Sequence, residues 1–246
     1  FLLKKVIFFI PFWFIIFKLY DSISAAVIKI LDLNCFNLTC IASFERSSNK
    51  TQWVMPSFAH ANIDTEEIIF ALKNDHLDVG ILVTPLNEKG IYETTLFYEE
   101  MKLYVNPNHK FAASKSILSS EIATDNLWLM SKGNCFRTQV VNLCDYNSKL
   151  EEQKHFKFES GSLETIINLV NKEGGYTILP ELAAENLHTN GVLKQFTNIK
   201  PLREVGLAYS RTNVKIKLLE LLSTEIIDSV PKHMIDKGEG EIVYWR

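Results

Sequence analysis

Two cysteines nine residues apart are the side chains of this sequence best suited to redox chemistry. Cys135 and Cys144 stand in the segment SKGNCFRTQVVNLC. Asn134 can cap a helix that starts at Cys135, which would place the Cys135 thiol at the positive end of that helix. Arg137 adds a cation two residues later. Both effects favour a thiolate and lower the pKa of a thiol, and the thiolate is the form that reacts with peroxide.

The spacing decides what a bridge between these two cysteines would require. Nine residues of intact helix rise by roughly 13–14 Å, whereas a disulfide needs Cα atoms about 4.4–6.8 Å apart. A bridge therefore requires the helix to unwind, which would make the segment a two-state element. The alternative is that Cys135 and Cys144 are buried and act as small hydrophobic side chains, and spacing alone leaves this alternative open.

Helices and strands alternate along the chain from residue 63 onward. Helices are expected at residues 64–72, 135–144, 161–171, 182–187 and 215–228. Strands are expected at residues 77–83, 94–105, 127–130, 157–160, 176–179 and 204–209. This alternation predicts an α/β protein with mainly parallel sheets.

Composition excludes several classes of protein. The chain has 246 residues, 47% of them apolar, and a net charge of −3, which favours one large or two small globular domains without a dominant basic surface. Cys35 and Cys40 have no companion ligands, the six His show no ligand spacing, and no Walker loop, dinucleotide-binding glycine pattern or G-x-S-x-G is present. We therefore expect no metal, no cofactor and no enzyme activity.

Residues 1–62 form an atypical hydrophobic N-terminal segment. Residues 6–17 read VIFFIPFWFIIF between lysines, too few for a membrane span, which takes about 20. Cations, an apolar run and then small residues resemble a signal peptide. Three interpretations stay open: a signal or anchor, a segment foreign to the fold, or a core element.

Three sequence segments resemble those of a known protein family. LDVGILVTPL, GSLETIINLVN and GGYTILPELA, in this order, resemble the effector-binding domain of LysR-type transcriptional regulators. SKGNCFRTQVVNLC resembles the cysteine segment of the hydrogen-peroxide-sensing OxyR branch, which has two cysteines nine residues apart and an Arg two after the first. The resemblance covers about residues 63–228. This chain has Asn134 where that branch usually has His, and it shows no winged helix-turn-helix.

The resemblance implies two Rossmann-like subdomains of the periplasmic-binding-protein-like type. The first would comprise residues 63–95 and 202–230, the second residues 96–201 with the redox cysteines, and residues 231–246 would be a polar tail. We expect the first subdomain to be incomplete, short of a strand, unless residues 27–33 or 36–42 supply it. Small effectors bind in the cleft between such subdomains.

The resemblance also implies a redox-sensing regulatory domain of a transcriptional activator in the cytoplasm. Hydrogen peroxide would oxidise Cys135 to a sulfenic acid, and attack by Cys144 would form a reversible disulfide. The sensor pocket would contain Thr84, Asn134, Arg137, Thr138 and Gln139. A homodimer or tetramer is expected. DNA would be bound only through a winged helix-turn-helix absent from this chain, and a membrane only if residues 6–17 act as a signal or anchor.

Less specific interpretations compete with these roles. Thr84 could cap a strand end, and Gln139 could belong to a solvated helix face. Ser160 and Ser162 precede a helix N-terminus, which suits an anion but also fits simple capping. A periplasmic solute-binding protein would share the two-lobed architecture. A thiol peroxidase is the third candidate, although no C-x-x-C recycling motif is present.

Overall fold

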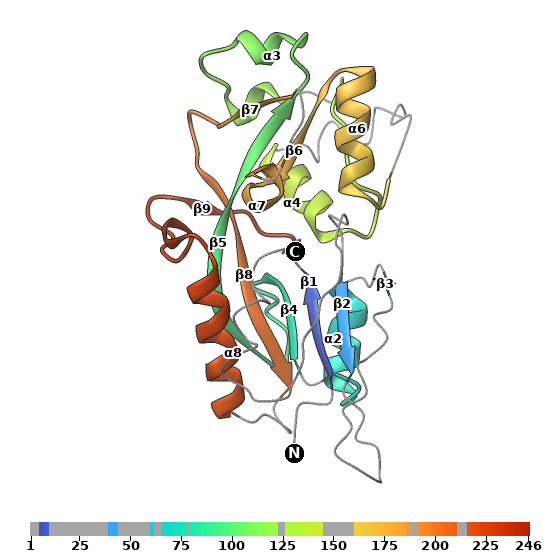
Figure 1. Cartoon of the computed structure of the whole chain (residues 1–246), viewed down its shortest axis with the longest axis vertical. Coiled ribbons are helices and arrows are strands. Elements are labelled where there is room, and N and C mark those ends of the chain that lie inside the picture. The colour runs from blue at the N-terminus through green and yellow to red at the C-terminus, as the bar shows by residue number, and fades with distance from the viewer. Residues whose placement is uncertain are drawn as a thin grey trace. The chain divides into compact units, whose positions relative to one another are not determined.

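The chain folds into two compact units (Figure 1). The computed structural model describes residues 5–9, 39–43, 60–61, 65–77, 79–122, 126–144, 160–185, 187, 191–210 and 216–246. The first unit comprises Phe1–Phe97 and Glu204–Asp236, and the second comprises Tyr98–Arg203 and Lys237–Arg246. Strands β5 (Ile91–Val105) and β8 (Pro201–Ser210) each contribute residues to both units. The chain therefore passes between the units within these two strands and again near its C-terminus.

A sheet with the strand order β3-β2-β1-β4-β8-β5 forms the first unit. Its further strands are β1 (Lys5–Phe9), β2 (Thr39–Ser43), β3 (His60–Ala61) and β4 (Val79–Thr84). Every residue of β4 is buried, as expected for a nearly continuous apolar run inside a sheet. Strand β4 runs antiparallel to β8, with Thr84 opposite Glu204, and parallel to β1.

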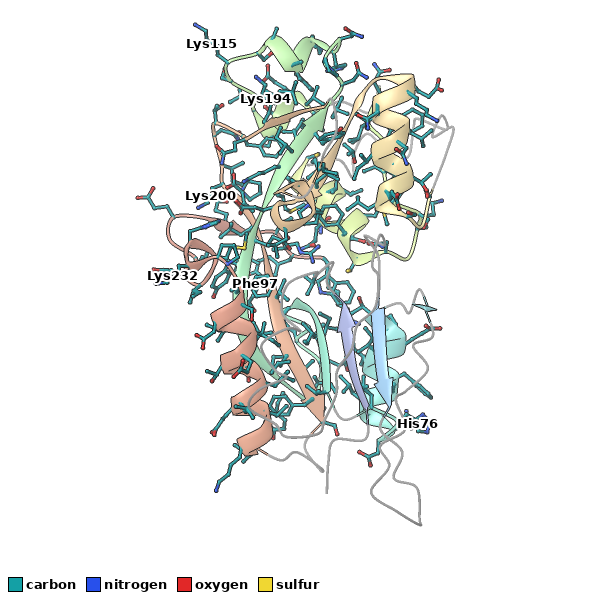
Figure 2. The ribbon with its side chains drawn as sticks, in the orientation of Figure 1. His76, Phe97, Lys115, Lys194, Lys200 and Lys232 are labelled. Carbon is teal, nitrogen blue, oxygen red and sulfur yellow. The ribbon has the colours of Figure 1, made fainter. Side chains whose placement is uncertain are left out.

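Helices α2 (Thr65–Lys73) and α8 (Ile216–Ser229) complete the described core of the first unit, followed by the 3₁₀ turn η3 (Lys232–Met234). Two acidic residues in the first turn of α2 and Lys73 in its last turn complement the helix dipole. Ile68 and Leu72 of α2 are fully buried, and the helix contacts β4. Phe97 on β5 is also fully buried (Figure 2).

In the second unit, β5 pairs antiparallel with β6 (Tyr176–Pro180) and β7 (Val192–Lys194). Strand β9 (Glu241–Ile242) pairs parallel with the start of β8. The helical elements of this unit are α3 (Lys110–Ala113), η2 (Ser119–Glu121), α4 (Cys135–Leu143), α6 (Leu163–Glu173) and α7 (Glu181–Glu185).

Helix α6 shows how local sequence signals set the ends of an element. The Ser162 hydroxyl caps it by accepting a hydrogen bond from the Thr165 N–H, at 3.4 Å. Ile166 and Val170 turn inward and are at most 1% exposed. Gly174 follows with a φ of 84°, a conformation that glycine adopts without a Cβ penalty. The predicted cap, apolar face and glycine stop of this helix are confirmed.

Two expectations about the sheets are wrong. The pairs between β4 and β8, β5 and β6, and β5 and β7 are all antiparallel, so the described strands do not form mainly parallel sheets. The physical reason is that an alternation of helices and strands does not fix strand direction, which depends on the partner that each strand pairs with. Residues 127–130 form isolated bridges at Leu127 and Met130, not a strand, and Trp128 between them donates its N–H to the Tyr176 carbonyl.

Part of the N-terminal segment forms strands. Strand β1 begins the apolar run, and β2 overlaps residues 36–42, the run proposed from sequence as a possible strand. Strand β1 lies between β2 and β4 in the sheet order. The other alternative, residues 27–33, lies outside the described residues, as do Cys35, most of residues 6–17 and residues 157–159. In the described part of the chain, no helix is long and apolar enough to cross a membrane.

The segment expected as a polar tail is folded. Met234 is 1% exposed in the first unit. Residues 237–246 belong to the second unit, where the Glu241 N–H donates to the Lys200 carbonyl and the Val243 N–H donates to the Leu202 carbonyl. Val243 itself is 8% exposed. Its hydrogen bonds with β8, and not its composition, give this C-terminal segment its structure.

Candidate redox site

Helix α4 carries both cysteines of the predicted pair. Asn134 precedes the helix with φ −80° and ψ 124°, and its Oδ1 accepts a hydrogen bond from the Phe136 N–H at 2.9 Å. This is an N-cap, and it makes Cys135 the first helical residue. The N–H groups of a first helical turn have no intrahelical partners. The predicted position of Cys135, at the positive end of a helix, is therefore confirmed.

The second cysteine stands at the opposite end of the same helix. Cys144 is the C-cap residue, and its N–H donates to the carbonyls of Val140 and Asn142. Neither cysteine is disulfide-bonded, and both are buried, with exposures of 3% for Cys135 and 8% for Cys144. Along the helix axis, the nine-residue spacing separates the two cysteines by about 13–14 Å. This conformation is therefore a dithiol state that cannot form a bridge without rearrangement.

Burial raises the pKa of the Cys144 thiol from 9.0 to about 12. The cause is desolvation, which disfavours the charged thiolate. Cys144 is therefore a protonated thiol at neutral pH and a poor nucleophile while α4 is intact.

Arg137 and Thr138 follow Cys135 in the first turn, and both are half-buried. The Arg137 guanidinium donates from Nη1 to the Met130 carbonyl at 2.7 Å, which ties the helix start to the preceding segment. A guanidinium has five N–H donors, so this bond leaves capacity for other acceptors. The Thr138 N–H donates to the Asn134 carbonyl at 3.4 Å.

Gln139 lies in the middle of α4 and is fully buried, so its assignment to a solvated helix face is wrong. Its Nε2 donates to the Val243 carbonyl at 2.6 Å. Asn142, one turn later, donates from Nδ2 to the Tyr244 carbonyl at 2.8 Å. The C-terminal segment therefore packs against the cysteine helix, a contact spanning about a hundred residues of sequence that no local pattern indicates.

Arg203 is a second residue that sequence reasoning missed. Its side chain is 4% exposed, and its Nε lies 2.9 Å from Oε2 of the fully buried Glu99. The guanidinium carbon lies 5.6 Å from the centre of the ring of Phe136, the neighbour of Cys135. A buried cation thus reaches the start of α4. The sequence feature that could have indicated this residue is a single Arg within the largely apolar segment PLREVGLAYS. Arg203 lies one residue before the strand expected at residues 204–209.

Thr84 belongs to the first unit, whereas the residues described above belong to the second. It is 1% exposed, and its hydroxyl donates to Oε1 of Glu204 at 2.7 Å. The structure thus brings Asn134, Cys135, Arg137, Thr138, Gln139 and Cys144 together on one helix of the second unit and places Thr84 on a strand of the other unit.

The remaining candidates have structural explanations or lie outside the site. Ser162 caps α6, and the Ser160 hydroxyl accepts from the Ser162 N–H at 3.1 Å and donates to its carbonyl at 3.3 Å. Both serines thus organise the helix start. Cys40 is in β2. Among the described residues, no group of three or more His, Cys, Asp or Glu side chains could hold a metal ion.

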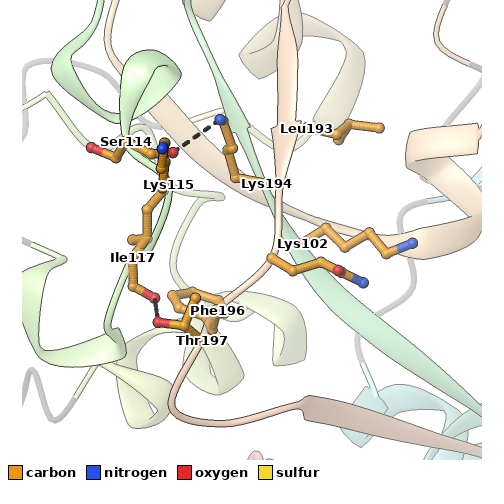
Figure 3. Close-up of a pocket in the computed structure, with 9 residues that line it drawn as sticks. Lys102, Ser114, Lys115, Ile117, Leu193, Lys194, Phe196 and Thr197 are labelled. Carbon is orange, nitrogen blue, oxygen red and sulfur yellow. Dashed lines mark hydrogen bonds between the residues drawn. The ribbon is translucent and has the colours of Figure 1, made fainter.

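A cavity of about 450 Å³ lies elsewhere in the second unit (Figure 3). Its lining includes the buried Ile117 and Phe196 and three lysines, Lys102, Lys115 and Lys194. Lys102 pairs with Glu181 at 2.6 Å, and Lys194 donates to the Ser114 carbonyl at 3.1 Å. Figure 2 labels Lys115 and Lys194. None of the predicted redox residues lines this cavity, so we keep it separate from the redox site.

Comparisons with known proteins agree on one class. Residues 61–230 match the family model described as the LysR substrate binding domain. The hydrogen peroxide-inducible genes activator of Haemophilus influenzae is 26% identical over 174 residues, which cover 70% of this chain and 56% of that protein. The DNA-binding transcriptional dual regulator OxyR of Escherichia coli is 29% identical over 147 residues, covering 59% of this chain and 47% of that protein. The chain thus spans about half the length of these relatives.

Solved structures give the same result. The crystal structure of OxyR from Porphyromonas gingivalis has a TM-score of 0.65 and 27% sequence identity, covering 75% of this chain and 84% of that chain. The reduced form of the OxyR regulatory domain from Pseudomonas aeruginosa has a TM-score of 0.59 and 28% identity, covering 67% and 79%.

The two α/β units and these matches define a domain of the LysR substrate-binding type, with the periplasmic-binding-protein-like fold. Because the family model covers more than half of the sequence, the chain belongs to the LysR family through its substrate-binding domain.

Proposed function

We propose that this chain is the hydrogen-peroxide-sensing regulatory domain of a LysR-type transcriptional activator, and that it responds by a reversible Cys135–Cys144 disulfide. One observation carries the proposal: both thiols are reduced and buried, and they occupy the two ends of a single short helix. The Asn134 cap places one of these thiols, Cys135, at the positive end of the helix. The names of the relatives, hydrogen peroxide-inducible genes activators, support the same chemistry.

The reaction balances with peroxide as the only oxidant. The Cys135 thiolate attacks one oxygen of hydrogen peroxide, the O–O bond breaks, and hydroxide leaves with the electron pair. The product is a sulfenic acid at Cys135. The Cys144 sulfur then attacks the Cys135 sulfur, the S–O bond breaks, and water is the final product. Two thiols are oxidised to one disulfide and one peroxide is reduced to two waters. A cellular thiol reductant would reverse the change.

The two cysteines have different roles because their surroundings differ. Cys135 has the helix N-terminus beside it and Arg137 two residues away, both of which favour a thiolate. Cys144 is held protonated by burial, with a pKa of about 12. We therefore assign the peroxide-reactive role to Cys135 and the resolving role to Cys144. In this proposal, Asn134, Arg137, Thr138 and Gln139, which lie with Cys135 in α4 or at its N-cap, form the sensor pocket.

The second step requires α4 to open, and its length makes that feasible. The helix has nine residues, whereas isolated helices shorter than roughly 12–15 residues are marginal in water. Its stability therefore comes mainly from its contacts with the rest of the unit. Opening would expose Cys144 to water, remove the desolvation that raises its pKa, and bring the two sulfurs within bonding distance.

The proposal for the whole protein goes beyond this chain. A winged helix-turn-helix outside the present sequence would bind DNA, and the regulator would act in the cytoplasm as a homodimer or tetramer. It would act as a regulator and not as an enzyme, as the names of the relatives, an activator of hydrogen peroxide-inducible genes and a transcriptional dual regulator, suggest.

Trapping the first intermediate tests this function. In Cys144→Ser, one equivalent of peroxide should leave a sulfenic acid at Cys135 that reacts with dimedone and is detected by mass spectrometry. In the unaltered chain the same adduct should be transient, because Cys144 consumes it. Cys135→Ser is the matched control and should give no adduct in this segment. Equal dimedone labelling of every cysteine present, in both the Cys144→Ser chain and the unaltered chain, would contradict the proposal.

A further inference from the structure

We infer that Gln139 and Asn142 are positioning residues that clamp the cysteine helix to the C-terminal segment, and that this clamp holds the sensor in its dithiol state. This inference rests on the proposed disulfide function, but its physical core, the clamp itself, can be tested in the reduced protein alone. We define the C-terminal segment as residues 237–246, all in the same unit as α4.

The clamp consists of two side chains on one helix face that reach consecutive main-chain carbonyls. Gln139 donates to the Val243 carbonyl at 2.6 Å, and Asn142 donates to the Tyr244 carbonyl at 2.8 Å. Asn142 is the third residue after Gln139, a spacing that places the two on one face only while the segment is helical. The two hydrogen bonds can therefore form together only while α4 is helical.

The other side of the C-terminal segment is fixed to the sheet. Glu241 and Val243 donate their N–H groups to the carbonyls of Lys200 and Leu202, at 2.9 Å and 2.8 Å. Gly240 fits closely beneath Leu202, because a Cβ there would lie 2.2 Å from Leu202 Cδ1. The segment is thus a short edge strand that joins β8 to α4.

Gln139 lies between the two cysteines, four residues after Cys135 and five before Cys144. A Cys135–Cys144 bridge requires the helix between the two cysteines to unwind. Gln139 and Asn142 would then lose their common face, and the bonds to the two carbonyls would break. By linkage, contacts present only in the helical state favour the dithiol over the disulfide.

The buried Gln139 side chain also suggests why such a clamp would be reversible. Its Oε1 has no hydrogen-bond partner among the described residues, although the residue is fully buried. An unpaired buried acceptor is unfavourable, so it offsets part of the gain from the Nε2 bond. A clamp with a small net contribution can bias the redox equilibrium without preventing oxidation.

Hydrogen exchange of the 246-residue chain tests the release of the segment. In the reduced protein, the Glu241 and Val243 amides should exchange slowly. After oxidation, with the Cys135–Cys144 bridge verified by mass, their exchange should accelerate at least tenfold. A verified bridge with unchanged protection of these amides would overturn the inference and leave the proposed function standing.

A substitution series tests the clamp independently of any oxidation. Gln139→Met keeps the shape but removes the donor, and in the reduced protein it should speed exchange of both α4 and the C-terminal segment. Gln195→Met is the matched control, an exposed glutamine of the same unit whose Nε2 bonds to Glu100 at 3.2 Å. If Gln139→Met fails to fold, the exposed Asn142→Ala takes its place. Unchanged α4 exchange in the folded variants would refute the clamp, even if no disulfide ever formed.

The reduction potential separates a positioning role from a merely structural one. Loss of the clamp destabilises the dithiol state relative to the disulfide, so Gln139→Met should favour the disulfide roughly tenfold, a shift of about 30 mV to more negative potential for this two-electron couple. Gln195→Met should leave the potential unchanged. A lower melting temperature in Gln139→Met with an unchanged potential would contradict the inference.

Discussion

At the scale of single residues, the two cysteines differ in what surrounds them, and the proposed roles rest on this difference. Cys135 follows an Asn134 cap at the start of α4, whereas Cys144 ends the helix with a pKa raised to about 12 by burial. In the proposed function this arrangement prevents premature bridging, because Cys144 becomes a nucleophile only after the helix opens.

The raised pKa of Cys144 predicts a pH dependence of stability. The folded state keeps its proton up to about pH 12, while the unfolded thiol titrates near its ordinary value of 9.0. Above pH 9 the unfolded state binds fewer protons, so the free energy of unfolding should fall as pH rises from about 9 toward 12, by at most about 1.4 kcal/mol per pH unit.

Urea unfolding of the reduced protein at pH 7 and pH 10 measures this effect. Cys144→Val has no ionisable group at this position, and its loss of stability between the two pH values should be smaller. Equal losses in both proteins would mean that the Cys144 thiol is not protected in the folded state.

At the scale of elements, α4 is a short helix whose start depends on a single side-chain cap. Asn134→Ala removes the bond from Phe136 N–H to Oδ1 and should lower the free energy of unfolding by about 1 kcal/mol. Because opening of α4 precedes bridging, this variant should also form the disulfide faster once Cys135 is oxidised. Stopped-flow measurement of the second oxidation step checks the expectation.

Asn134→Ser is the control for that experiment, because serine is also a good cap. Its stability and its rate of bridging should stay close to those of the unaltered chain. If the Ala and Ser variants bridge at the same rate, the N-cap does not control opening of the helix.

Local sequence patterns predicted the cysteine helix and its cap. The features that they did not predict depend on contacts between residues far apart in the sequence. Helix α4, its cap and the pair of cysteines followed from fourteen residues of sequence. Burial of Gln139 could not be predicted this way, because its partner Val243 lies more than a hundred residues away in a segment with a two-residue strand. The antiparallel sheets were missed for a related reason: helix and strand order does not reveal which partner each strand pairs with.

At the scale of the whole molecule, β5 and β8 are the strands that connect the two units. A buried ion pair within the second unit joins strand β5 to strand β8. Arg203 on β8 and Glu99 on β5 approach to 2.9 Å, and Oε1 of Glu99 also accepts the Leu182 N–H at 2.9 Å. A buried pair is costly to break because one charge stays unpaired. The pair therefore fixes the position of β8, and with it Arg203, beside Phe136 at the start of α4.

Arg203→Met should lower the free energy of unfolding by about 3–5 kcal/mol, because Glu99 would remain buried without its cation. The double variant Glu99→Leu with Arg203→Met should recover most of that loss. Chemical denaturation of both proteins gives the comparison, and a double variant no more stable than the single one would show that the ion pair is not the cause.

The central claim is that peroxide joins the two ends of α4, and peptide mapping tests it most directly. The reduced chain, treated with one equivalent of hydrogen peroxide, is digested without reduction, and the cross-linked peptides are sequenced by mass spectrometry. The account predicts a Cys135–Cys144 disulfide as the main product, which disappears on adding thiol. Oxidised protein in which Cys135 and Cys144 both remain thiols, or are bridged to other cysteines, would contradict it.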